Sequence, residues 1–88
     1  MAIKVTPEEL EAMAGQLKGF AGESTALAGK INSAVTAALN AWEGNAQKNY
    51  AERFAEIYPI ISTNLPQLIN DMALDAEQRA ARYRDADS

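Results

Sequence analysis

Apolar side chains recur at intervals of three and four residues along the first half of the chain. Three neighbouring lines of this repeat can be followed: Leu10, Leu17, Ile31 and Ala38; Met13, Phe20, Leu27, Ala34 and Ala41; and Ala14, Ala21, Ala28, Val35 and Trp42. Such spacing is that of one helix face. Because three adjacent lines are wider than the seam of a two-stranded coiled coil, the pattern predicts a long helix packed in a bundle.

The stretch Thr6-Pro7-Glu8-Glu9 predicts where this helix begins. The threonine side chain can accept a hydrogen bond from the amide three residues later, and proline suits the first helical position. The glutamate at position 9 completes a capping box. We therefore expect the first helix to run from about 7 to 40.

A second apolar stripe follows Gly44 and holds Ala46, Tyr50, Phe54, Ile57, Ile61, Leu65, Leu68, Met72, Ala76, Ala80 and Tyr83. Two consecutive steps of four residues, from Ile57 to Leu65, shift the phase of the repeat. Pro59 and Pro66 flank this shift, and an interior proline removes a helical hydrogen bond. The pattern predicts a second helix over 46–83 that is kinked near 59–66; the alternative is a third helix opened by Pro66.

The connection between the two helices is short, over 41–45, and contains Gly44, which can adopt the positive φ of a tight reversal. A short connection makes the helices antiparallel, so residues 1–88 are predicted to form one all-α helix-turn-helix hairpin. Two helices enclose little apolar surface. We therefore expect the hairpin to dimerise into a four-helix bundle, with a dimer core of Leu10, Leu17, Phe20, Leu27, Ile31, Phe54, Ile57, Ile61 and Leu68.

A line of small residues occupies the other side of the first helix: Ala12, Gly15, Gly19, Gly22, Ala26, Gly29 and Ser33. Glycine inside a helix costs about 0.5–1 kcal/mol relative to alanine. Two interpretations are open. The line is either a solvated face or a groove in which another backbone comes close.

The composition removes most catalytic chemistry. The chain has no cysteine and no histidine, so it lacks thiol nucleophiles, imidazole bases and the usual zinc ligands. We expect no enzyme activity, no cofactor and no metal site. The formal net charge of −4 disfavours nucleic acid as a partner. The N-terminal segment lacks the apolar stretch of a signal peptide, and no segment reaches the length of a membrane span.

Two positions have side chains suited to recognition. Trp42 either packs over the end of the bundle or is offered to a partner. Near the C-terminus, Asp85 and Asp87 are unfavourable at a helix end, so we expect a frayed tail over 84–88. In helical form, Tyr83 and Asp87 would share one face, as in a linear motif that folds on its receptor.

The central Trp42-Glu43-Gly44, placed between two helices, and the tail pattern Tyr83-x-x-x-Asp87 resemble the WXG family of small type VII (ESX) secretion substrates. The likeness covers the whole chain. It implies a homodimer, or a heterodimer with a sister WXG protein, that folds in the cytoplasm and is then secreted or reaches the cell surface. It also implies an export signal containing Tyr83 and Asp87, with Trp42 and Gly44 beside the tail of the partner, read by a membrane-bound FtsK/SpoIIIE-type ATPase.

The sequence thus favours a non-enzymatic secreted substrate or virulence-type effector. Two rivals are an intracellular helical adaptor or chaperone-like bundle that is not exported, and a membrane-active hairpin. The acidic chain lacks a polar face rich in Lys and Arg, so anionic lipid should attract it little and direct membrane insertion is not expected.

Overall fold

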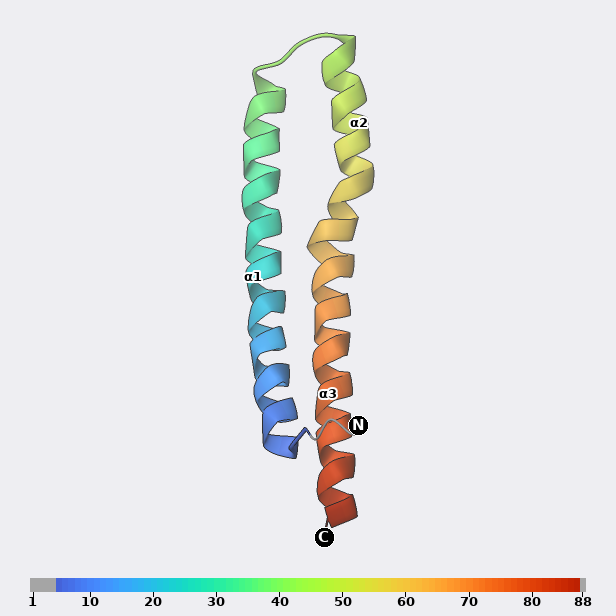
Figure 1. The fold of residues 1–88 in the computed structure, drawn as a ribbon. Coiled ribbons are helices and arrows are strands. Elements are labelled where there is room, and N and C mark those ends of the chain that lie inside the picture. The colour runs from blue at the N-terminus through green and yellow to red at the C-terminus, as the bar shows by residue number, and fades with distance from the viewer. Residues whose placement is uncertain (1–4, 88) are drawn as a thin grey trace.

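The chain folds as a long helical hairpin. The computed structural model describes residues 5–87. Helix α1 (Pro7–Asn40) forms one arm, and α2 (Asn45–Pro59), the π-helical turn η1 (Ile60–Asn64) and α3 (Leu65–Asp87) follow one another in the second arm (Figure 1). The molecule is a rod of 66 × 21 × 18 Å. The predicted all-α hairpin is confirmed.

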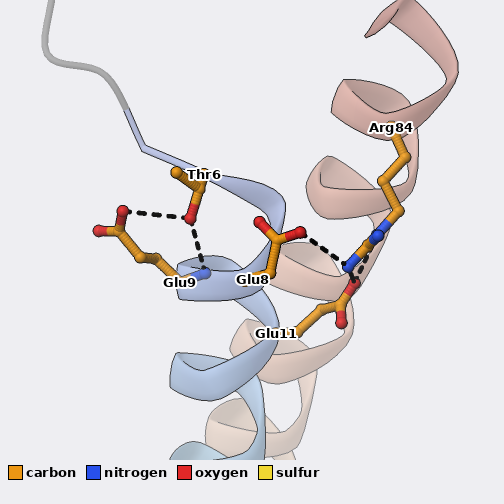
Figure 2. A network of polar contacts seen from close by, with 5 residues as sticks. All are labelled: Thr6, Glu8, Glu9, Glu11 and Arg84. Carbon is orange, nitrogen blue, oxygen red and sulfur yellow. Dashed lines mark hydrogen bonds and ion pairs between the residues drawn. The ribbon is translucent and has the colours of Figure 1, made fainter. Parts of the chain in front are cut away.

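The start of α1 is fixed by its cap. The Glu9 backbone N–H donates to the Thr6 Oγ1 at 3.1 Å, and this hydroxyl donates to the Glu9 carboxylate, also at 3.1 Å (Figure 2). Pro7 occupies the first turn, where its missing N–H costs nothing. Glu8 and Glu9 lie at the positive end of the helix dipole, which stabilises both the carboxylates and the helix start.

The second arm contains one wide turn where the sequence predicts a kink. The Leu65 backbone N–H donates to the carbonyl of Ile60, five residues earlier, so this turn holds more residues than an α-helical turn. The additional residue takes up the phase shift between Ile57 and Leu65. The arm continues through η1 without a break between α2 and α3 (Figure 1).

The two arms meet mainly through alanines. Three alanines of α1 and three of α3 are buried: Ala14, Ala21, Ala28, Ala73, Ala76 and Ala80. Their small side chains allow two helices to approach closely. No large side chain of the described chain is fully buried. The hairpin therefore has a close internal contact but only a small core of its own.

The C-terminal tail differs from the prediction. Helix α3 continues through Asp87, whereas the sequence predicted a helix ending at 83 and a frayed tail over 84–88; Ser88 lies outside the described residues. The physical reason is a contact that crosses the hairpin. Arg84 forms ion pairs with Glu8 and Glu11 of α1, and these oppose the unfavourable charge of the aspartates at the helix end.

None of the helices over residues 5–87 combines the length and apolarity that a membrane crossing requires.

Candidate functional site

One long side of the hairpin carries large apolar side chains that remain exposed. We call it the open face and define it by Met13, Phe20, Leu27, Tyr50, Ile57, Leu65, Leu68 and Met72. Leu27 is 57 % exposed and Leu68 is 60 % exposed. Large apolar side chains that stay exposed in this number are typical of an interaction surface.

Both arms contribute to the open face. A shallow groove of about 280 Å³ is lined by Leu10, Met13, Leu17, Met72, Asp75, Ala76 and Arg79. At its rim, the Arg79 Nε donates to the Asp75 Oδ2 at 2.9 Å. This hydrogen bond, together with the charge of the carboxylate, raises the pKa of the Arg79 guanidinium above its ordinary value. The groove is thus apolar at its base and charged along one edge.

The structure divides the predicted dimer core into two groups. Phe20, Leu27, Ile57 and Leu68 belong to the open face and are exposed. The other predicted members are half-buried within the hairpin: Leu10, Leu17, Ile31, Phe54 and Ile61. Neighbouring lines of the apolar stripe point in directions that differ by less than a full turn of the helix. One edge of the stripe therefore faces the other arm, and the other edge lies on the open face.

The opposite side of the hairpin is polar. Lys18 pairs with Glu77, and the Arg84 Nη2 lies 2.6 Å from the Glu11 Oε1. The line of small residues lies on the outer side of α1, and a Cβ added at Gly15, Gly19, Gly22 or Gly29 would meet nothing within 4 Å. Within one hairpin this line is therefore not approached by another backbone. The groove interpretation applies only to contact with another chain.

The turn is built by backbone geometry. The Trp42 N–H donates to the Leu39 carbonyl at 3.3 Å, extending the end of α1. Gly44 has a φ of 109°, a positive value that a residue with a side chain rarely adopts. Gly44 is also the N-cap of α2. Asn45 is the first helical residue of α2.

Trp42 is partly packed and partly accessible. Its side chain is 42 % exposed, and its ring centroid lies 5.9 Å from that of Tyr50. The two rings form one end of an apolar groove of about 230 Å³, lined by Ala34, Val35, Ala38, Leu39, Trp42 and Tyr50. The Gln47 Nε2 donates to the Leu39 carbonyl at 3.1 Å and ties α2 to α1 beside this groove. The indole therefore packs against Tyr50 and also leaves part of its surface accessible to solvent.

The turn and the tail are far apart in one chain. Tyr83 is 46 % exposed near the end of α3, whereas Trp42 lies in the turn at the other end of the rod (Figure 1). Asp87 is the last residue of α3, but its side chain lies outside what the structure describes. The two parts of the predicted signal can be brought together only by a second chain.

Over residues 5–87 no group of three or more acidic side chains is arranged to hold a metal ion. The structure instead has three exposed apolar features: an apolar face along the rod, an aromatic groove at the turn and an exposed tyrosine near the tail. This defines a helical hairpin with exposed apolar surface and with Trp-x-Gly at its turn. The chain belongs to the WXG100 family, described as proteins of 100 residues with WXG, whose model matches residues 2–88.

Solved structures with the same fold cover nearly the entire chain. Selenomethionine-labelled EsxB of Bacillus anthracis str. Sterne, described as a secreted protein, is 25 % identical with a TM-score of 0.79, over 100 % of this chain and 99 % of that one. Wild-type EsxB is 25 % identical with a TM-score of 0.78, over 96 % and 95 %. EsxA of Geobacillus thermodenitrificans is 23 % identical with a TM-score of 0.81, over 98 % and 92 %. No curated protein matches the chain.

Proposed function

We propose that this protein is a non-enzymatic substrate of a type VII (ESX) secretion system and is exported as a folded dimer. The observation that carries the proposal is the open face in a chain of the WXG100 family. Support comes from the similarity to EsxB, which is a secreted protein. The partner is a second copy of the chain or a sister WXG protein.

The dimer follows from the exposed side chains. Fully burying a large apolar side chain contributes about 1.5–3 kcal/mol. Leu27, Leu68 and Met72 are each more than half exposed in the single hairpin, so much of this contribution is unused. Two hairpins that join their open faces form a four-helix bundle and bury these residues.

The turn and the tail lie at opposite ends of one hairpin, so they can meet only if the partner binds in the antiparallel orientation. In an antiparallel dimer, the tail of the partner lies beside Trp42, and Tyr83 of this chain lies beside the turn of the partner. The apolar groove next to Trp42 and Tyr50 suits such a neighbour. We propose that this composite of turn and tail is what the FtsK/SpoIIIE-type ATPase recognises.

Export can be measured in culture supernatant, with and without a working secretion ATPase. We expect the wild-type protein to depend on the ATPase, and Tyr83→Ala and Asp87→Ala each to abolish export without changing the melting temperature of the dimer. Arg82→Ala, one residue before the tyrosine and exposed, is the matched control and should be exported. Normal secretion of both tail variants would refute the tail assignment. Retention of the wild-type chain inside the cell would instead favour an adaptor.

Trp42→Ala separates the two roles of the turn. Because the indole is only partly buried and its main aromatic contact is Tyr50, we expect a loss of about 1–2 kcal/mol in the free energy of unfolding. Full burial would give a loss of about 3–5 kcal/mol. Loss of export with stability nearly retained assigns recognition to the indole; a loss of several kcal/mol would show that capping dominates.

A further inference from the structure

The two ends of the chain are joined by a charged contact near the tail. The Arg84 Nε donates to the Glu11 Oε1 at 2.8 Å, and the Arg84 Nη2 lies 2.6 Å from the same oxygen. The same Nη2 lies 3.7 Å from the Glu8 Oε1. Figure 2 shows the guanidinium between the two carboxylates, with Glu8 and Glu11 on α1 and Arg84 on α3. We call these three residues the clasp.

The clasp lies where the helix dipoles also favour its charges. Glu8 and Glu11 are near the positive N-terminal end of α1, and Arg84 is near the negative C-terminal end of α3. Glu8 and Arg84, which lie in the terminal turns, therefore stabilise their own helices as well as the contact between them. Asp85 follows immediately and is unfavourable at this helix end. The clasp thus opposes fraying of the last turns.

A second ion pair specifies the same alignment of the arms. Lys18 lies seven residues after Glu11, and Glu77 lies seven residues before Arg84; Lys18 pairs with Glu77 as Glu11 pairs with Arg84. The sign of the charge alternates along both helices. Sliding one arm by seven residues would place like charges opposite each other, with Glu11 facing Glu77 or Lys18 facing Arg84. Such juxtapositions disfavour other registers.

Arg84 and Tyr83 are consecutive, so their directions on α3 are coupled. In an α-helix of about 3.6 residues per turn, consecutive side chains point about 100° apart. When Arg84 is held by α1, the direction of Tyr83 is therefore set about 100° away from that contact, and the tyrosine is 46 % exposed. A frayed tail would leave this direction undefined.

We propose that the clasp is a positioning device for the tail: Arg84, held by Glu8 and Glu11, keeps α3 helical past Tyr83 and sets the direction of the tyrosine. Its consequence for export rests on the proposed function of the tail. Its consequence for structure does not, and the two can be measured separately.

Amide hydrogen exchange of residues 83–86 in the folded protein tests the device at low ionic strength. Arg84→Gln and Glu11→Gln should each lower the protection of these amides by about two- to fivefold, as expected for one exposed ion-pair network. Glu11→Gln is the more stringent of the two tests, because Glu11 lies 73 positions from Arg84 in the sequence. Arg82→Gln is the matched control: it removes the same charge from the same helix, and over the part of the chain that the structure describes Arg82 makes no ion pair.

Two further measurements distinguish the loss of the cross-helix contact from the effect of a general change of charge. The double variant Glu11→Gln/Arg84→Gln should be no less protected than Arg84→Gln alone, because the loss of Arg84 already removes its contact with Glu11. At about 1 M salt the wild-type tail should exchange like that of the variants, since the Debye length falls to about 3 Å. If Glu11→Gln exchanges like Arg82→Gln, the clasp does not order the tail and the proposal is overturned.

The export assay tests the consequence for recognition. Where Tyr83→Ala abolishes export, Glu11→Gln and Arg84→Gln should reduce the secreted amount while Arg82→Gln does not. Unchanged export of Glu11→Gln despite a loosened tail would overturn the positioning role. If Tyr83→Ala is exported normally, the proposed function of the tail fails, and the exchange measurement still decides whether the clasp exists.

Discussion

The two long sides of the hairpin use the same pair of helices in opposite ways. On the open face, Phe20, Leu27 and Leu68 leave large apolar groups in contact with solvent. On the polar side, the charged residues are already paired within one chain, Lys18 with Glu77 and Glu11 with Arg84. The open face is therefore incomplete in a single hairpin, whereas the polar side is complete. This difference indicates where a second chain belongs.

The two sides also contribute different amounts of free energy. Exposed ion pairs are worth about 0–1 kcal/mol each, so the polar side aligns the arms more than it stabilises them. A buried leucine contributes about 1.5–3 kcal/mol, so the open face holds most of the stability that a partner can add. The comparison can be tested by disturbing each surface in turn.

The largest effect is expected on the open face. Leu68→Asp removes a side chain that a symmetric dimer would bury twice, so we expect the dimer to weaken by at least about 3 kcal/mol, or roughly a hundredfold in Kd. Sedimentation equilibrium measures the change. Leu74→Asp is the matched control, because Leu74 is a leucine of the same helix, 50 % exposed, that is not part of the open face. Equal weakening by both substitutions would contradict the assignment of the face.

The next effect is expected between the arms. Ala21→Leu would enlarge a side chain that is 3 % exposed at the closest approach of the helices. Overpacking of this kind costs about 1–3 kcal/mol, which thermal unfolding would show as a lower melting temperature. Ala26→Leu makes the same change at an exposed position of α1 and should alter stability by less than about 0.5 kcal/mol. A melting temperature unaffected by Ala21→Leu would argue against the alanine contact.

The smallest effect is expected on the line of small residues. A Cβ at Gly22 meets open space, so Gly22→Ala should stabilise the helix by about 0.5–1 kcal/mol without affecting association. Gly44→Ala gives the contrast: there the φ of 109° should make the same substitution destabilising by about 1–2 kcal/mol. If Gly22→Ala instead weakens the dimer, the line is a groove for another backbone and the solvated interpretation is wrong.

The start of α1 and the place of the irregularity in the second arm could be predicted because their causes are local. A capping box at Thr6 and a proline at position 7 mark the start of α1 wherever the rest of the chain lies. Two successive steps of four residues close to Pro59 and Pro66 mark where the second arm departs from regular α-helix, and η1 lies there. Periodicity and turn chemistry suffice for such features.

The clasp and the division of the apolar stripe could not be predicted because they depend on how the arms are aligned. Periodicity shows which side of α1 is apolar, but not that the line of Ala14 and Ala21 would lie at the closest approach while Phe20 stayed outside. Likewise, local charges predicted a frayed tail, since the partner of Arg84 is 73 positions away. The one available signal was the matching seven-residue spacing of opposite charges in the two helices.

We propose that the open face is covered by another chain in the functional protein. Sedimentation velocity of the purified chain at micromolar concentration, with circular dichroism on the same sample, tests it most directly. We expect the helical, cooperatively folded species to be a dimer, or the chain to become folded only when a sister protein is added. A stably folded, helical monomer at this concentration would contradict it.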